Sequence, residues 1–312
     1  MLKPLLRAVL LASLLFAVSA CGEKTPEQAA APAAQASTPD GAILRSAQLL
    51  KNDDIQGLIR HAMPPADYER TRAEWTRDVN STPVTDEDRQ KFAETMQKLT
   101  APGAEEALFA EIEPQLRAFD AEYQQQMPMY VAMGTGWLQG MVQESKDLSP
   151  EARQQAIAAI AAMGEWVRKT RFTDPASVKQ IIAILVRAAR EVDVHTLEQA
   201  RALGFEQSVD KMRITVRALK DALAVYGLSV DRTLESVKAE ALSNDGNTAK
   251  VLVSYTLFDT PLTGEMEMVN VDGRWYDKDT IDKLRAQAAE SSGDEAGPDD
   301  AGAEPQPPGE GD

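Results

Sequence analysis

The chain has 312 residues, and its 49 Asp and Glu residues against 33 Lys and Arg residues give a formal net charge of −16 at pH 7. This excess of negative charge argues against nucleic-acid binding and against electrostatic adsorption to anionic lipid. The single cysteine excludes an intramolecular disulfide, so stability must come from packing in one large core or two smaller ones.

The first residues have the layout of a secretory signal peptide. Lys3 and Arg7 form a basic start, residues 8–18 are apolar apart from Ser13, and small residues precede Cys21. The apolar run is too short to span a bilayer stably. We therefore predict that residues 1–20 are a cleaved signal.

The sequence Val18-Ser19-Ala20-Cys21 resembles the lipobox of bacterial lipoproteins. The resemblance implies cleavage before Cys21, attachment of a diacylglyceryl group to its thiol, and acylation of the new amino terminus with a chain such as palmitate. Gly22 follows the cysteine, where the family's sorting rule favours the outer membrane, with the folded part in the periplasm. The alternative is an ordinary cleaved signal with an incidental cysteine.

Residues 21–39 are predicted to form a lipidated, disordered tether, because they are rich in Ala, Pro, Gln, Ser and Thr. At the other end, residues 287–312 carry eight acidic residues and no Lys or Arg. We predict a disordered, solvating acidic tail there. Weak binding of divalent cations or of a basic partner is the alternative for this tail.

A helical pattern dominates residues 40–226. Thr85 and Asp88 resemble a capping box at a helix start, and Pro114 is predicted to kink or break a helix. No charged residue occurs between Glu122 and Glu144, a run too polar and too interrupted by glycine for a transmembrane helix. We interpret this run as the central helix of a bundle, surrounded on most sides.

After Leu228 the apolar period changes from helical to two, which is typical of strands. Residues 237–241, 249–257, 262–271 and 274–276 predict an antiparallel meander with a hairpin turn at Asn244-Asp245-Gly246, and a small helix is expected near residues 280–285. On the third strand Met266 and Met268 share one face while Val269 and Val271 share the other, so we expect a bulge or a curved sheet.

These patterns predict an α+β fold, in which a mostly helical bundle is followed by a small C-terminal antiparallel β-meander. We divide it into a helical domain over residues 40–172 and a second part over residues 173–286, in which helices accompany the four strands. With its Asp272-Gly273-Arg274-Trp275-Tyr276 ending, the second part resembles NTF2-like domains, including those of uncharacterised bacterial lipoproteins. That family has no fixed catalytic residues to transfer.

Candidate chemistry is sparse. His61 and His195 lie in separate helical segments without a neighbouring His or Cys, which favours helix-surface or helix-end roles over a zinc site. No Gly-x-Ser-x-Gly motif is present, and Gly134-Thr135-Gly136 lacks the strand and the Gly-Lys of a phosphate loop. We expect no catalytic residue, no metal site and no cofactor.

Two further patterns have structural explanations. Gly136 and Gly140 are four residues apart, which favours close packing of helices. The methionines near them could suit Cu(I), but methionine that fills gaps in a helical core is the commoner case. The five methionines are Met127, Met129, Met133, Met141 and Met163.

The sequence therefore favours a membrane-anchored envelope lipoprotein that acts as an accessory or interaction protein with an envelope protein partner, and not an enzyme. Its membrane contact is expected through the lipid on Cys21. The alternative is a small-molecule binding protein that uses a pocket between the C-terminal sheet and the helices, with Tyr255, Met266 and Trp275 as candidate ligand-binding residues.

Overall fold

The computed structural model describes residues 37–145, 148 and 150–293. The fold is α+β, with a mostly helical chain and a C-terminal four-stranded antiparallel sheet, as predicted. The helices before the sheet are α2 (Pro39–Lys51), α3 (Ile55–Ala62), α4 (Pro65–Ser81), α5 (Asp86–Thr100), α6 (Ala104–Glu144), α7 (Pro150–Lys169), α8 (Pro175–Val192), α9 (Leu197–Ala202), α10 (Phe205–Val225) and α11 (Val230–Glu235).

The predicted meander is confirmed, with strand order β1-β2-β3-β4. The elements are β1 (Lys238–Asn244), β2 (Thr248–Leu257), β3 (Thr260–Val271), β4 (Arg274–Asp277) and the closing helix α12 (Lys278–Gly293). The first turn is made at Gly246, whose φ of 92° favours glycine. Helix α12 includes residues 287–293, which the sequence assigned to the tail.

The bulge expected on the third strand is instead on β1, between Ala241 and Ser243. β3 pairs with β2 without interruption. Apolar residues on both faces of β3 need no bulge, because both faces are covered near β4. Met268 packs in one core and Val269 packs against another. The division of the chain at residue 172 stays a prediction.

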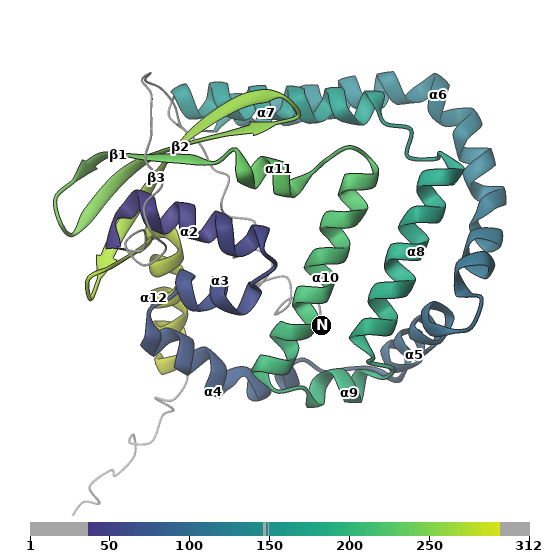
Figure 1. The fold of residues 1–312 in the computed structure, drawn as a ribbon, viewed down its shortest axis with the longest axis horizontal. Helices are drawn as coiled ribbons and strands as arrows, with labels where there is room; N and C mark the ends of the chain where they lie inside the picture. Colours follow the sequence, from purple (N-terminus) through teal and green to yellow (C-terminus); the bar gives the residue numbers. More distant parts are fainter. Residues whose placement is uncertain (1–36, 146–147, 149, 294–312) are drawn as a thin grey trace, which may run out of the picture.

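Three hydrophobic cores hold the fold together. One joins α2 to the sheet, a second joins α3, α4 and α10 to β4 and α12, and a third joins α5 and α6 to α8. Figure 1 shows α2 and α3 between the sheet and α10, with α8 beside α10 and α6 on the outside. The N-terminal helices and the C-terminal sheet therefore share two of these cores.

Local signals in the sequence explain several helix boundaries. The capping box is confirmed, because the Thr85 hydroxyl accepts from the Asp88 backbone N–H at 3.1 Å and Asp88 accepts from the Thr85 N–H at 3.0 Å. Pro114 does not break the helix, since α6 continues through both Pro114 and Pro128, and a kink at Pro114 stays a prediction. Figure 1 shows α6 rising along one side of the molecule and then turning to run beside α7.

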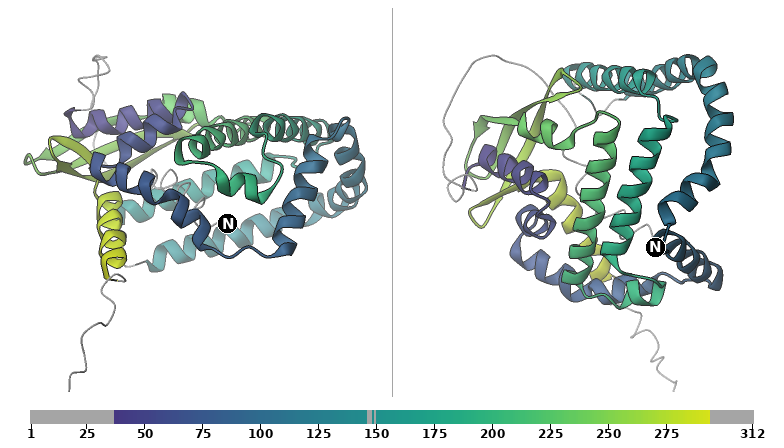
Figure 2. Two further views of the ribbon diagram at one scale, coloured as in Figure 1. Left: turned by 90° about the horizontal axis from the view of Figure 1, so that it is seen from below. Right: turned by 45° about the vertical axis from the view of Figure 1, so that its right-hand side comes forward.

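The prediction that the uncharged run 123–143 is a buried central helix is wrong. Met129, Met133, Trp137 and Met141 are 53–66% exposed. Met129, Met133 and Met141, which the sequence assigned to core filling, therefore lie at the surface, whereas Met127 is partly buried. The physical reason is that α6 lies at the outside of the structure and packs on α7 by one side. Burial in a core therefore does not explain why this run has no charged residue. Figure 2 shows α6 and α7 side by side in two further views.

Candidate functional site

A cavity of about 300 Å³ lies between the sheet and the helices α2, α3 and α10. Its volume is at the lower end of the range of small-molecule sites, about 300–1,000 Å³. Most of its wall is aliphatic or aromatic. The lining residues of the sheet and α12 are Met266, Met268, Trp275, Tyr276, Asp277 and Thr280, and those of the helices include Ala42, Ile43, Leu50, Ile55, Leu58, Ile59, Met63, Trp75, Phe205, Met212, Val216 and Leu223.

Two of the three candidate ligand-binding residues meet at this cavity. Met266 and Trp275 line it, and Trp275 is 5% exposed. Tyr255 is not among the lining residues, because it pairs with Leu262 while Trp275 pairs with Asn270. Eight residues of β3 separate those positions, about 26 Å along a strand. The alternation of apolar and polar residues predicted that Tyr255 lies on a strand. It could not show that β4 pairs only with the far end of β3, away from the residue that pairs with Tyr255.

Sequence reasoning missed the half of the cavity that α2, α3 and α4 supply. Trp75 of α4 and Phe205 of α10 line it, and their rings meet edge to face with centroids 5.6 Å apart. The apolar stripes of these helices showed that they face a core. They did not show that the core is shared with a sheet more than 150 residues later in the chain.

Two polar groups in the wall have no hydrogen-bond partner among the described residues. They are the indole Nε1 of Trp75 and the hydroxyl of Tyr276, and both atoms are buried. Burial raises the pKa of Tyr276, so the hydroxyl keeps its proton. An unsatisfied buried donor costs about 1–3 kcal/mol, so each of these groups would gain from an acceptor.

His61 is buried more deeply than a helix-surface role requires. Its Nε2–H donates to the carbonyl oxygen of Ala42 at 2.8 Å, which links α3 to α2 beside the cavity. Burial lowers the pKa of His61, against the opposing effect of that hydrogen bond. The neutral form is therefore the one that the fold favours.

This shift predicts a pH-dependent stability. The contribution of His61 is fully present above pH about 6.5, the pKa of an unfolded histidine, and is lost as pH falls toward the lower folded pKa. His61→Gln keeps an N–H donor without the titration, so its free energy of unfolding should fall less than that of the unmodified chain between pH 7.5 and 5.5. Urea unfolding at both pH values measures the difference, and equal losses would contradict the assignment.

Asp277 is an acidic residue in the cavity wall. Burial raises the pKa of Asp277, and the hydrogen bonds that its Oδ1 accepts from the Thr280 N–H and hydroxyl, at 2.8 and 2.7 Å, oppose that rise. These bonds cap the start of α12. The Asp277 carboxyl group therefore has a structural role at the start of α12.

Lys220 is a buried cation whose Nζ donates to three acceptors, the carbonyls of Leu50 and Lys51 at 3.3 and 2.9 Å and Asp53 Oδ1 at 2.6 Å. It also forms an ion pair with the carboxylate of Asp231 at 2.6 Å. Burial lowers the pKa of Lys220, but the two carboxylates outweigh burial and leave it raised. Lys220 therefore ties α10 to the α2–α3 connection and to α11.

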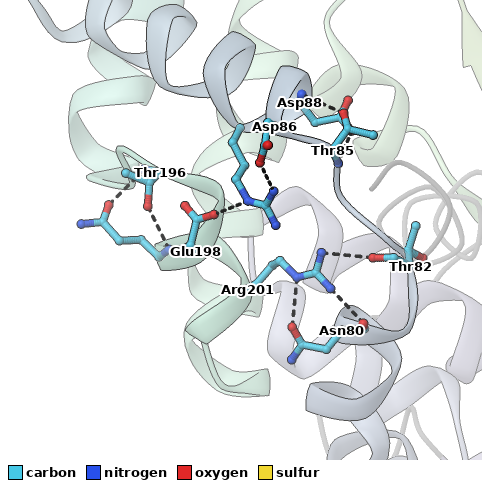
Figure 3. A network of polar contacts seen from close by, with 10 residues as sticks. Asn80, Thr82, Thr85, Asp86, Asp88, Thr196, Glu198 and Arg201 are labelled. Atoms are coloured by element: carbon cyan, nitrogen blue, oxygen red, sulfur yellow. Dashed lines mark hydrogen bonds and ion pairs between the residues drawn. The ribbon is translucent and has the colours of Figure 1, made fainter.

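A second, open hollow lies where α4, α5 and α9 meet. Figure 3 shows the network of polar contacts formed by residues of these helices and of the connection between α4 and α5. Arg201 donates to Asn80 Oδ1 at 3.0 Å and to the carbonyls of Asn80 and Thr82 at 2.9 and 3.1 Å. Arg89 pairs with Asp86 and Glu198. Both guanidinium groups thus have oxygen partners within the protein. Arg201 caps the end of α4, and Arg89 joins α5 to α9.

The remaining candidates lie elsewhere. Cys21 lies outside the described residues, as do residues 1–36 of the predicted signal and tether. The predicted end of the tether at residue 39 is wrong, because Thr38 caps α2 and Pro39 is its buried first residue. His195 is half exposed, with its Nε2 3.1 Å from Asp193 Oδ1. Over residues 37–145, 148 and 150–293, no three His, Cys, Asp or Glu side chains gather in a way that could hold a metal ion. In the same part of the chain, no helix has the length and apolar character needed to cross a membrane.

No protein-family model, curated protein or solved structure matches this chain.

Proposed function

We propose that the chain is a lipid-anchored envelope protein that binds an apolar small molecule in the cavity between α2, α3, α10 and the sheet. The observation that supports this function is the cavity itself, because a well-packed core leaves few voids larger than a water molecule. Its apolar wall with a few polar groups has the composition of ligand sites. The lipid on Cys21 would hold the binding domain at the membrane.

The wall also indicates the chemistry of the ligand. Its aliphatic and aromatic side chains fit an apolar body. The unpaired Trp75 N–H and Tyr276 hydroxyl each favour an oxygen acceptor, such as a carbonyl or ether. The ligand we propose is therefore a mainly apolar molecule with one or two acceptor groups. A strongly charged molecule fits poorly, since the charged groups that line the cavity already have protein partners.

Filling the cavity should weaken binding. Met266 is half buried in the wall, and Met266→Trp adds bulk there. The probe is N-phenyl-1-naphthylamine, a neutral fluorescent molecule that the acidic chain does not repel. With the full chain in the Cys21→Ala form, which avoids detergent, we expect saturable one-to-one binding that weakens at least about tenfold in Met266→Trp.

The matched control is Met163→Trp on α7, where the side chain is 39% exposed and lies outside the cavity wall. It should bind the probe as the unmodified chain does. Circular dichroism of both variants checks that they fold. Equal probe binding by Met266→Trp and the unmodified chain would exclude the cavity as the site.

The role predicted first from the sequence, an accessory protein with an envelope partner, is a second candidate. The large exposed apolar side chains on α6 favour it, because such surfaces mark interaction sites. Crosslinking in intact cells tests it. A defined envelope protein crosslinked to the chain, and lost in the Cys21→Ala form, would support this role over ligand binding alone.

A further inference from the structure

The described surface carries an apolar stripe on the second half of α6 that the fold does not explain. It consists of Met129, Tyr130, Met133, Trp137 and Met141, which are 51–66% exposed, and we call it the α6 stripe. At 100° per residue these five side chains fall within an arc of about 120°. They therefore form one continuous face of the helix.

The opposite side of α6 has a partner within the chain. Helix α7 approaches so closely there that a Cβ added at Gly164 would lie 2.5 Å from the Thr135 side chain and 3.6 Å from that of Val131. Thr135 and Val131 lie roughly opposite the α6 stripe by helical angle. The structure thus explains one face of α6 and leaves the stripe uncovered by the described residues.

Glycines beside the stripe are equally unexplained. Gly136 and Gly140 lie four residues apart along its edge, next to Met129 and Met133 by helical angle. A Cβ added at either position would meet nothing within 4 Å, so the predicted close packing on them does not occur within the described chain. Glycine weakens a helix relative to alanine. Their position is advantageous only if another helix approaches this face.

The charge of the stripe distinguishes it from the rest of the chain. No Asp, Glu, Lys or Arg occurs between Glu122 and Glu144, although the chain carries a net charge of −16. Two copies that met through other surfaces would bring acidic groups together. Two copies that met through the α6 stripe would not, so this face permits self-association that the remaining charge opposes.

We propose that the α6 stripe is the interface between two copies of this chain. In an isologous pair of antiparallel helices, Met133 and Trp137 of each copy would enter the space above Gly136 and Gly140 of the other. Five side chains of which about 100 Å² each is exposed amount to about 1,000 Å² for two copies. That is about the smallest area expected of a specific interface, so the dimer should dissociate in the micromolar range.

A lipid surface is the competing occupant, because Trp and Tyr favour membrane interfaces. A bilayer, however, gains nothing from Gly136 and Gly140, whereas a second helix uses the space above them. The inference does not depend on the ligand cavity, since none of the five residues of the α6 stripe lines it.

Sedimentation velocity of the full chain in the Cys21→Ala form tests the proposal over a range of concentrations. We expect a monomer–dimer equilibrium that weakens at least tenfold when Trp137→Lys places a positive charge on each side of the interface. Gly140→Ala should weaken the dimer several-fold, although alanine is the better helix former. Leu185→Lys is the matched control, because Leu185 is 48% exposed on α8, and its dimer should be unchanged.

Several results would overturn the proposal. They are a monomer at all concentrations, a Trp137→Lys dimer as strong as that of the unmodified chain, or a Gly140→Ala dimer of unchanged strength. Binding of the monomer to phosphatidylcholine vesicles, lost in Trp137→Lys, would assign the stripe to the membrane instead. Circular dichroism confirms that each variant folds.

Discussion

Replacing Trp275 with alanine is expected to lower the free energy of unfolding by about 3–5 kcal/mol. Trp275 is 5% exposed and packs with Val251, Met268 and Ala42, so its loss leaves a large void between α2 and the sheet. Urea unfolding followed by circular dichroism gives the difference. The effect is large because this side chain contributes to a core and to the cavity wall at once.

The chain supplies its own control for this substitution. Trp137 is 66% exposed on α6, and Trp137→Ala should change the free energy of unfolding by no more than about 0.5 kcal/mol at concentrations where the chain is monomeric. Similar losses for the two tryptophans would contradict the burial that the structure assigns to each. A small loss for Trp275→Ala alone would mean that the core around the cavity is less well formed.

Replacing Lys220 with methionine is expected to cost about 2–4 kcal/mol of stability. Methionine keeps much of the apolar stem but leaves Asp53 and two carbonyls without their donor and Asp231 without its cation, and removal of one partner from a buried ion pair is strongly destabilising. Because the pKa of Lys220 is raised, its contribution is present at all pH values below about 10.5 and is lost only above. The penalty should therefore be the same at pH 6 and pH 8.

Arg217→Met is the matched control for Lys220. Arg217 lies one turn earlier on α10 and pairs with Glu191 of α8, and both side chains are 39% exposed. Such surface pairs contribute about 0–1 kcal/mol, so this variant should be nearly as stable as the unmodified chain. Equal losses of the free energy of unfolding in the two variants would mean that the buried network of Lys220 stabilises the fold no more than a surface ion pair does.

Short-range signals predicted much of the fold. The hairpin at Asn244-Asp245-Gly246 and the alternation of Val251 and Val253 gave the meander, and the Thr85–Asp88 capping box gave a helix start. Each depends on neighbouring residues, which a sequence displays directly. The α+β class followed from the change of apolar period from helical to two.

Features that depend on distant residues could not be predicted. The cavity requires Trp75, Phe205 and Trp275 to line the same space, and nothing in the local pattern of any of the three specifies that arrangement. The uncharged residues 123–143 were misread for a similar reason. A helix without charges suits a buried core or an exposed interface equally, and only the packing of α6 separates the two.

Native mass spectrometry of the full Cys21→Ala chain, purified from cells without detergent, tests the central claim most directly. The account predicts one small molecule of a few hundred daltons per chain, an ordinary size for an apolar ligand of such a cavity. The bound mass should be lost in Met266→Trp and kept in Met163→Trp. A chain with no added mass that also fails to bind N-phenyl-1-naphthylamine would contradict the proposal that this cavity is a ligand site.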